Sequence, residues 1–489
     1  MPNITAKQTR KIYTIIGLEI HAQLLTRTKI FCGCNTDYLN AAPNANTCAV
    51  CLGMPGALPV LNTQAVDYAL TGALALNCTI LKRSKFDRKN YFYPDLPKGY
   101  QISQYDEPLA VDGHLELEMK RDGEVEFKRV GIQRVHLEED TGKLIHNEDD
   151  SSSVDLNRAG VPLIEIVTAP ELISPREAVE FMRELRRILR YLGVSDGNME
   201  AGSLRCDANI SISLEPGQLG TKTEIKNMNS FKAVEQALAF ERERQRRVLE
   251  AGGTVVQQTM HWNADTGRAE VGRVKETADD YRYFPEPDLV PVKIDEAHIA
   301  RLRETLSELP AEKRARWRTT YRVPDYDIKV LTEEQALADY FEAVVRRFDR
   351  PKVVSNWMMS ELLRLLKEGE GEGKGEGIPM EPTEFAELLE LVEAGQINRN
   401  TGKTVLEEAF KTGKRPKTIV EEQGLAQISD EAALEVIVSE VLEANPEAVA
   451  DYRSGNEKVF GFLVGQVMKR TRGQANPKIA SQLLRERLG

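Results

Sequence analysis

The chain has 489 residues, enough for two to four domains, and its 41% hydrophobic content supports a sizeable core and excludes a disordered chain. The formal net charge of −11 excludes a uniformly basic nucleic-acid coat, although a local basic patch remains compatible with it. No apolar run approaches the ~18 residues of a membrane helix. The polar start MPNITAKQTRK contains no apolar signal segment, so we expect a cytoplasmic protein with no membrane partner.

Residues 1–295 are predicted to be rich in short strands, because alternating runs are separated by Gly, Pro, Asn and Asp turns. Two helices are expected to interrupt these strands. The first has Ser174 as its N-cap and Pro175 at its first position, and it stops at Gly193. The second spans about 231–250 and carries a heavily charged outer face.

Four of the six cysteines are crowded between residues 32 and 51, as a C-x-C pair and a C-x-x-C pair: Cys32, Cys34, Cys48 and Cys51. Four thiolates suit a tetrahedral zinc ion and leave no open position for catalysis, so we predict a structural zinc knuckle. The alternative is four reduced cysteines packed in the fold. Cys78 and Cys206 lie in apolar surroundings and are expected to pack as small hydrophobic residues.

Several predicted strands carry one apolar face and one charged face. In GLEIHAQL, Glu19, His21 and Gln23 share the face opposite Leu18, Ile20 and Ala22, because side chains alternate along a strand. The polar residues of the other strands are Arg134, His136 and Glu138 in QRVHLEED, Glu165 in VPLIEIVT, Arg205, Asp207 and Asn209 in RCDANISI, and Lys222, Glu224 and Lys226 in TKTEIKN.

These charged faces indicate one floor for a metal and a nucleotide, provided that Glu19, His21, Glu138 and Glu165 lie on adjacent strands. Mg²⁺ takes carboxylate oxygens together with substrate phosphates, and Arg or Lys neutralises a transferring phosphoryl group. The alternative is a solvated sheet face with cross-strand ion pairs. The chain has no P-loop and no G-x-G-x-x-G after a strand, so an ATP site would have to be built on the sheet.

Two segments rich in aromatic residues and Pro, 89–109 and 280–289, are expected to form rigid loops. They could line a pocket or stack on a base, or they could only pack against the sheet.

Beyond about Asp295, periodic Leu, Ala, Glu and Arg predict an all-helical half. The tract EGEGEGKGEG at 368–377 interrupts it and is expected to be a surface loop. Residues 458–489 hold seven Lys or Arg against one acid, which favours either phosphate binding or an ordinary solvated helix face.

These motifs together resemble the B-subunit family of the bacterial and organellar aspartyl/glutamyl-tRNA amidotransferases. The resemblance runs in order through almost the whole chain: GLEIHAQL, CGC…CAVCLGMPGALPVLN, RKNYFYPDLPKGYQISQY, HLEEDTGK, DLNRAGVPLIEIVT, RCDANISI, EIKNMNSF, DYRYFPEPDL and GQVMKRTRGQANP. The resemblance implies an α+β fold. An N-terminal cradle with an antiparallel sheet, like that of glutamine synthetase and guanidino kinases, would span 1–295. A helical domain would span 296–410, and a small helical tRNA-binding tail would span 411–489.

The resemblance also implies a heterotrimer with an amidase A subunit and a small C subunit. The amidase would release ammonia from glutamine. This chain would use ATP to phosphorylate the side-chain carboxylate of mischarged Glu-tRNA(Gln) or Asp-tRNA(Asn), and ammonia would then displace phosphate.

The family's functional residues carry over to the matching positions. The resemblance implies Mg²⁺ and nucleotide ligands at Glu19, His21, Glu138 and Glu165, further site residues at Glu139, Arg205, Asp207 and Asn209, Lys89 at the entry of an ammonia path, zinc on the four cysteines, and tRNA contacts at Lys469, Arg470 and Arg472. Two rival readings stay open: a tRNA-binding scaffold with a sheet that has lost its chemistry, and a stand-alone amide ligase acting on a free amino acid.

Overall fold

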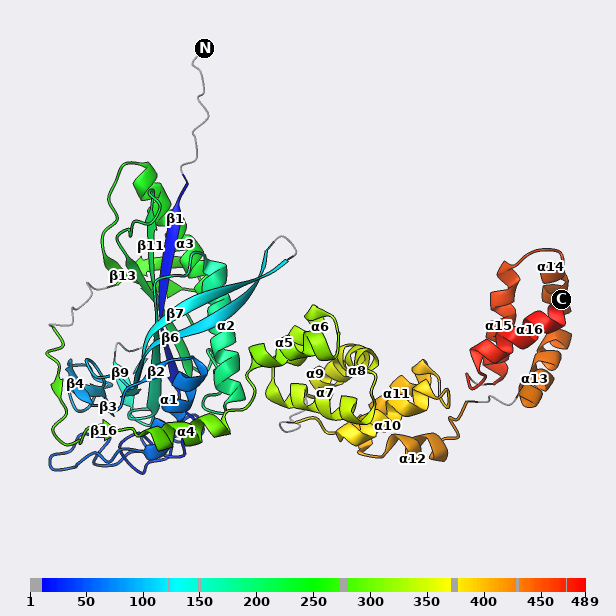
Figure 1. The fold of residues 1–489 in the computed structure, drawn as a ribbon, viewed down its shortest axis with the longest axis horizontal. Coiled ribbons are helices and arrows are strands. Elements are labelled where there is room, and N and C mark those ends of the chain that lie inside the picture. The colour runs from blue at the N-terminus through cyan, green and yellow to red at the C-terminus, as the bar shows by residue number, and fades with distance from the viewer. Residues whose placement is uncertain are drawn as a thin grey trace, which may run out of the picture. The chain divides into compact units, whose positions relative to one another are not determined.

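The computed structural model of the chain describes residues 11–121, 124–147, 149, 151–272, 280–370, 377–427, 431–471 and 473–489. The chain divides into two units, Met1–Pro310 and Ala311–Gly489. In the described residues of the first unit, nine strands form one sheet in the order β14-β13-β12-β11-β1-β10-β7-β6-β2 (Figure 1). Neighbouring strands are antiparallel, except that β12 and β13 are parallel.

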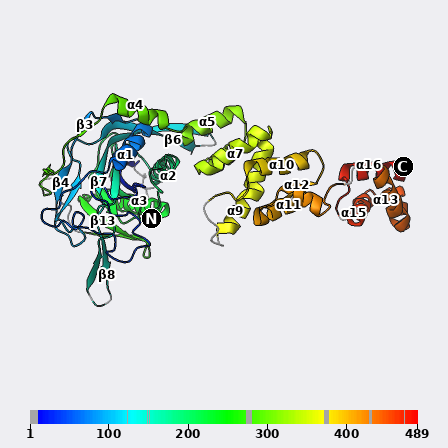
Figure 2. The same ribbon diagram turned by 90° about the horizontal axis from the view of Figure 1, so that it is seen from below.

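The strands of the large sheet are β1 (Tyr13–Gln23), β2 (Thr79–Ile80), β6 (Ala110–Arg121), β7 (Glu124–Glu139), β10 (Pro162–Thr168), β11 (Leu204–Ser213), β12 (Thr223–Lys226), β13 (Gln258–Asn263) and β14 (Arg268–Val271). Three small sheets accompany it. They are β15 (Phe284–Pro285) with β4 (Asp87–Asn90) and β5 (Tyr100–Ser103), β16 (Val292–Lys293) with β3 (Arg83–Ser84), and β8 (Lys143–His146) with β9 (Ser152–Asp155). Figure 2 shows the β8–β9 hairpin projecting from the body of this unit.

One face of the large sheet carries the hydrophobic core. Leu18, Ile20 and Ala22 on β1 are completely buried there, whereas the residues between them are partly exposed on the other face. The helices packed on the core side are α1 (Thr63–Ala75), α2 (Pro175–Tyr191), α3 (Phe231–Glu250) and α4 (Glu296–Thr305). The predicted alternation along β1 is therefore confirmed, and it leaves the opposite face for polar side chains.

Local signals fix the two predicted helices of this unit. The Ser174 hydroxyl accepts a hydrogen bond from the Glu177 amide at 3.2 Å, and Pro175 occupies the first helical position of α2. Gly193 follows the helix with a positive φ of 63°, a conformation that glycine adopts without steric cost. The second prediction, about 231–250, agrees with the bounds of α3.

The second unit is helical throughout its described residues, as predicted. Its helices are α5 (Pro310–Thr320), α6 (Asp325–Leu331), α7 (Gln335–Arg347), α8 (Pro351–Trp357), the π-helix η1 (Met358–Leu362), α9 (Leu363–Glu370), α10 (Pro382–Glu393), α11 (Arg399–Thr412), α12 (Pro416–Glu422), α13 (Glu431–Ala444), α14 (Pro446–Arg453), α15 (Lys458–Arg470) and α16 (Pro477–Leu488). The tract expected to be a loop falls largely on 371–376, which lie outside the described residues.

Two separate hydrophobic clusters stabilise this helical unit. The first runs from Trp317 to Val420, and the second runs from Leu434 to Leu488. α12 therefore packs with the first cluster, although it lies beyond the expected domain boundary at 410. The two expected boundaries, near 295 and 410, remain predictions. Among all described residues, no helix is long and apolar enough to span a bilayer.

Candidate active site on the sheet

Four side chains from four neighbouring strands form a row across the polar face of the sheet. The register places His21 of β1 opposite Glu165 of β10 and Arg205 of β11, and it places Glu165 opposite His136 of β7. Directly opposite residues of antiparallel strands share one face, with their Cβ atoms about 4.5–5.5 Å apart. The row therefore concentrates a carboxylate, two imidazoles and a guanidinium on the predicted face.

A group of two carboxylates and one imidazole in this region has the spacing of a cation site. His21 Nε2 lies 3.4 Å from an oxygen of Glu138 and 3.4 Å from an oxygen of Glu165. One donor atom from each of the three residues lies within 4.8 Å of the others. Glu138 and Glu165 are only 3% and 7% exposed, and burying two carboxylates together is costly unless cations compensate them. The donor set therefore fits a divalent cation.

The protonation states of this group depend on one another. Burial alone would lower the pKa of His136, but the charge of Glu165 and hydrogen bonds to Glu138 and Glu165 outweigh burial and raise the pKa to about 9. The same carboxylates raise the pKa of His21 against the effect of burial. Burial favours the neutral form of Glu165, yet the two histidines hold its pKa well below its usual range. The carboxylates are therefore ionised, as metal ligands must be.

Three other expected site residues lie along the same face. Asn209 Nδ2 donates a hydrogen bond to Glu19 Oε1 at 2.9 Å, and the Asp207 carboxylate lies 2.5 Å from Lys226 Nζ. Glu19 is not part of the three-residue cation group, but it borders the same cavity. Glu19 and Asp207 therefore line the floor cavity. Asn209 orients the Glu19 carboxylate through its hydrogen bond.

Arg205 is fixed by a buried acid that the sequence analysis did not single out. Its Nη2 lies 2.9 Å from Asp140 Oδ1, and Gln23 Nε2 donates a hydrogen bond to the other oxygen of Asp140 at 2.8 Å. Burial favours the neutral acid, but the charges of Arg205 and Arg158 keep the pKa of Asp140 below its usual range. The guanidinium is therefore held at one edge of the floor.

A cavity of about 490 Å³ covers the floor, and the two aromatic segments form part of its lining. These segments meet as neighbouring strands, because β4 pairs with both β5 and β15. Tyr105 and Tyr283 stack with their ring centroids 4.2 Å apart, and Lys89 Nζ lies 4.9 Å from the ring centre of Tyr281. The pocket-lining role considered for both segments is thus confirmed geometrically, and Lys89 lines the same cavity as the carboxylates.

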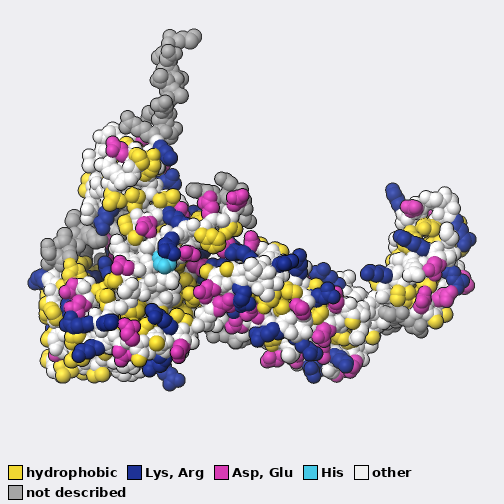
Figure 3. Space-filling view, viewed as in Figure 1, with side chains coloured by type: hydrophobic (Ala, Val, Ile, Leu, Met, Phe, Trp, Pro, Cys, Tyr) yellow, Lys and Arg dark blue, Asp and Glu magenta, His cyan; other side chains and the backbone are white. Residues whose placement is uncertain are grey.

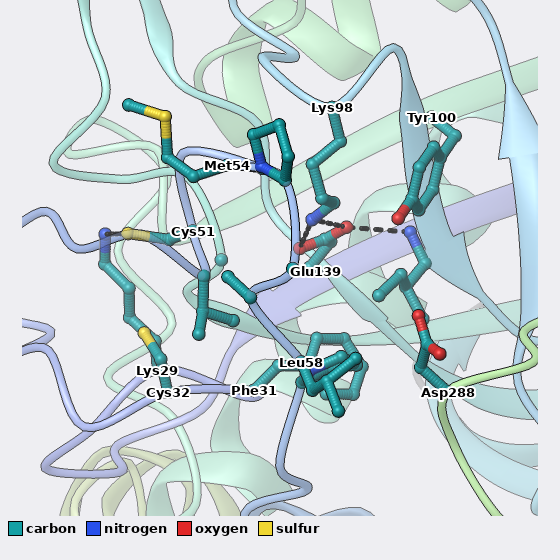
Figure 4. A pocket seen from close by; sticks show the side chains of 18 residues that line it. Lys29, Phe31, Cys32, Cys51, Met54, Leu58, Lys98, Tyr100, Glu139 and Asp288 are labelled. Carbon is teal, nitrogen blue, oxygen red and sulfur yellow. Dashed lines mark hydrogen bonds and ion pairs between the residues drawn. The ribbon is translucent and has the colours of Figure 1, made fainter.

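Glu139 points away from this floor into a neighbouring cavity of about 230 Å³ (Figure 4). Lys98 Nζ lies 2.5 and 2.6 Å from its two carboxylate oxygens, and the Ile102 amide donates to it at 2.8 Å. On the same strand β5, the Ser103 hydroxyl instead donates to Glu138 at 3.1 Å. Strand alternation therefore sends the two consecutive glutamates to two different pockets.

The four crowded cysteines converge as the spacing predicts. One sulfur from each lies within 4.8 Å of the others, and all four are free thiols with no disulfide between them. Lys29, which is completely buried, places Nζ 3.6 Å from Cys51 Sγ (Figure 4). The hydrogen bond from Cys32 and the Lys29 charge lower the pKa of Cys51 to about 4, despite burial. A cluster of four sulfurs with a thiolate and a buried cation fits a tetrahedral metal site.

Comparison with known proteins assigns this arrangement to a family. The GatB/GatE catalytic domain matches residues 14–300, and the GatB domain matches residues 339–488. The chain is 54% identical to the B subunit of the aspartyl/glutamyl-tRNA(Asn/Gln) amidotransferase of Caldanaerobacter subterraneus, over 98% of this chain and 99% of that one. It is 55% identical to the protein of the same name from Moorella thermoacetica, over 97% of this chain and 99% of that one. The chain belongs to the GatB family.

GatB membership confirms the resemblance stated above. It identifies the chain as one component of a tRNA-dependent amidotransferase, which is a glutamine-dependent carbon–nitrogen ligase. The matched catalytic domain contains the whole floor, the cavity above it and the cysteine cluster.

The residues expected to contact tRNA lie outside that domain. Lys469 and Arg470 are exposed at the end of α15, and Arg470 Nη2 lies 2.9 Å from a Glu440 carboxylate oxygen. Arg472 lies outside the described residues. Figure 3 shows Lys and Arg side chains interspersed with Asp and Glu over the helices of the second unit. Of the three residues expected to contact tRNA, Lys469 and Arg470 are exposed, and Arg470 is already paired with Glu440. Lys469 is therefore the residue chosen to test tRNA contact.

The structure places on the floor several residues that were not among the expected site residues. Arg134, His136 and Lys226 had been assigned to charged strand faces by alternation, but no site role was predicted for them. Asp140 and Ser103 also line the floor cavity or contact its carboxylates, and the strand patterns did not point to them. Their role depends on how strand ends meet in three dimensions.

Proposed function

We propose that this chain activates the side-chain carboxylate of Glu-tRNA(Gln) or Asp-tRNA(Asn) with ATP and then amidates it with ammonia. The observation that carries this proposal is the convergence of His21, Glu138 and Glu165 with the cations Lys89 and Arg205 around one cavity. The relatives' names specify the same pair of aminoacyl-tRNA substrates for those proteins.

The reaction needs positioning and charge neutralisation rather than a covalent enzyme nucleophile. The substrate carboxylate oxygen attacks the terminal phosphorus of ATP, ADP leaves, and an acyl phosphate forms. Ammonia then adds to the acyl carbon, and phosphate leaves with the bonding electron pair as the amide forms. No thiol is required, in accord with Cys206, whose burial raises its pKa well above the usual thiol range.

In this proposal, His21, Glu138 and Glu165 hold Mg²⁺, and Glu19 lies beside them. The bound ion would neutralise phosphate charge. Arg205 and Lys226 would orient the phosphates from one side of the floor. Lys89 would face the reacting carboxylate, at the point where ammonia is proposed to arrive. Burial opposes the charged form of Lys89, but nearby Tyr283, Glu138 and Glu165 raise its pKa, so it stays protonated.

A structural Zn²⁺ would be held by Cys32, Cys34, Cys48 and Cys51. Four thiolates leave no position for substrate, so its contribution would be to fold stability. The ammonia would come from an amidase A subunit assembled with a small C subunit, and the basic end of the chain would contact tRNA. The cytoplasmic location, the cradle likeness to glutamine synthetase and guanidino kinases, and the domain boundaries belong to this same proposal.

The decisive experiment uses the assembled complex with Glu-tRNA(Gln), ATP, Mg²⁺ and ammonium chloride, without glutamine. The natural chain should form Gln-tRNA. The Glu138→Gln variant should lose at least about 10²-fold in rate, because one charged ligand of the ion that neutralises the phosphoryl group is gone. Its affinity for tRNA should stay within about twofold, because the change is local.

Glu116→Gln is the matched control, since Glu116 lies on β6 with an exposed carboxylate. It should keep full activity. Equal activity of Glu138→Gln and the natural chain would refute the proposed site. Amidation of free glutamate at a comparable rate would favour the stand-alone ligase instead.

A further inference from the structure

A completely buried lysine lies against the cluster of four cysteine sulfurs. The Nζ atom of Lys29 lies 2.7 Å from the carbonyl oxygen of Asn46 and 3.3 Å from that of Leu156. Its third contact is Cys51 Sγ, at 3.6 Å (Figure 4). An ammonium group has three N–H donors, and these three acceptors use all of them. The side chain is therefore held in one position beside the sulfurs.

Among the described residues, no carboxylate forms an ion pair with this ammonium, and two of its three acceptors are neutral carbonyls. Lys98, which lines the same cavity, differs, because both carboxylate oxygens of Glu139 lie 2.5 and 2.6 Å from its Nζ. A buried charge is costly unless an opposite charge compensates it. The charge that compensates Lys29 must therefore come from the sulfur atoms around Cys51.

Lys29 also contacts both cysteine pairs. Its backbone amide donates a hydrogen bond to the carbonyl oxygen of Cys34 at 3.0 Å, whereas its side chain reaches Cys51 of the second pair. The stem of the side chain passes Gly160, where a Cβ would lie 3.4 Å from Lys29 Cδ. Gly160 has a φ of 87°, so a larger residue there would also be strained. The neighbouring chain thus leaves room for this lysine between the two halves of the cluster.

The charge of the metal cluster gives this placement a role. A divalent ion bound by four thiolates leaves a doubly negative group, which is costly to bury without a cation nearby. A charged N–H donor on a thiolate also lowers the electron density that the sulfur gives to the metal. The alternative is that Lys29 only ties the segments of Asn46 and Leu156 together. That role would need its hydrogen bonds but not its charge.

We propose that Lys29 is a positioning residue of the metal site, whose ammonium stabilises the zinc–thiolate cluster by its charge and by its hydrogen bond to Cys51 Sγ. The inference rests on the zinc site of the proposed function and not on the proposed reaction. Lys29 acts on the metal through its ligand, so it raises zinc affinity and lowers the donor strength of Cys51.

The test compares Lys29→Met and Lys29→Gln with the natural full-length chain. Met removes the charge and the hydrogen bonds, whereas Gln removes the charge and keeps N–H donors. Titration of the zinc-loaded chains with a chelator gives the apparent zinc dissociation constant, and Co²⁺-substituted chains give the sulfur-to-metal charge-transfer band. Lys98→Met is the matched control, because Lys98 lines the same cavity but pairs with Glu139. Thermal unfolding of the zinc-loaded chains reports whether each variant is folded.

Both Lys29 variants should bind zinc about 10- to 100-fold more weakly than the natural chain, the loss expected when a partner of a metal ligand is removed. Their Co²⁺ band should move to longer wavelength, because a sulfur without the ammonium gives up electrons more easily. Lys98→Met should keep the zinc dissociation constant within about twofold and the band in place, because Glu139 compensates the Lys98 charge.

Natural zinc affinity in folded Lys29→Gln would overturn the proposal, whatever Lys29→Met shows, because the charge would then not be needed. Weaker zinc binding with an unmoved Co²⁺ band would also overturn it, since Lys29 would then act only through the segments that it ties together. If one of the two variants does not fold, the other decides by the same two measurements.

None of these measurements uses turnover, so a failure of the proposed reaction leaves their result intact. A natural chain that binds neither Zn²⁺ nor Co²⁺ would refute the proposed metal site, and with it the role of Lys29. A natural chain that holds zinc as tightly as both folded Lys29 variants would refute the role of Lys29 alone.

Discussion

The two units differ in how their charged groups are clustered. In the sheet unit, Glu138, Glu165 and His136 are almost fully buried on one face, where the imidazole lies 3.0–3.8 Å from the carboxylates. In the helical unit, Arg487 pairs with Glu435 and Arg470 pairs with Glu440 on the surface, and the buried Lys313 pairs with the exposed Asp339. Buried charges are costly to keep and are expected where chemistry needs them, whereas surface pairs contribute little. The comparison indicates that the sheet unit is where charged groups are gathered for chemistry.

Loss of the proposed zinc should have the largest effect, and it should be confined to the sheet unit. Cys51→Ser should abolish bound zinc and destabilise this unit by on the order of 5 kcal/mol, because part of the metal-binding free energy is folding free energy. Metal analysis and hydrogen exchange resolved by segment would measure both changes.

The control for this variant is Cys78→Ala, since Cys78 is buried away from the cluster. It should keep full zinc content. Full zinc content in Cys51→Ser would contradict the proposed zinc site. An equal loss of hydrogen-exchange protection in the helices of residues 311–489 would contradict an effect confined to the sheet unit.

Removal of one exposed cation from α15 should have an intermediate effect, limited to tRNA binding. Lys469→Ala should reduce the slope of log affinity against log salt by about 1, if the ammonium neutralises one phosphate. The ammonia-driven rate at saturating tRNA should not change, because Lys469 lies outside the catalytic domain match. Titrations at several salt concentrations would measure the slope.

Lys417→Ala is the matched control, because Lys417 is also exposed on a helix, α12. It should leave the slope unchanged. An unaltered slope for Lys469→Ala would show that this part of the helical unit does not contact RNA.

The smallest effect concerns Glu342, a partly buried acid of the helical unit. Burial raises its pKa, but hydrogen bonds from Arg316 and Trp317 and the charge of Lys313 outweigh burial and lower it. The ionised form therefore stabilises the folded unit above the unfolded pKa of about 4.3, and this contribution is lost as the pH falls through the folded-state pKa. Glu342→Gln should cost about 1–2 kcal/mol of unfolding free energy at pH 7.

The difference between Glu342→Gln and the natural chain should shrink as the pH falls through the lowered folded-state pKa of Glu342, and it should approach zero only once that carboxyl is protonated in the folded chain. Denaturant titrations at several pH values would show this. Glu390→Gln is the control, because Glu390 makes only an exposed pair with Arg347 at 3.6 Å. A pH-independent cost at Glu342 would mean that shape rather than charge matters there.

Sequence alternation predicted which side chains share a face, but not which strands are neighbours. His21 and Glu165 could each be assigned to a polar face from their own strands. Their contact depends on β1 pairing with β10, which is set by the shared core and by the long connections between the strands. The cysteine cluster was easier to predict, because its members lie close in sequence. For Glu139 the prediction was less successful. The family resemblance placed it with the floor residues, whereas it lines the neighbouring cavity.

The adjacency of Glu138 and Glu139 makes the length of β7 as important as its residues. Insertion of one codon between Arg134 and Glu138 would turn Glu138 towards Lys98 and leave the histidines facing the wrong side chain. The same shift would place Leu137, which is fully buried in the core, at the floor position of Glu138, so it would disrupt both the cation group and the packing of β7. Inherited length changes are therefore expected in the turns of this unit and not within β7.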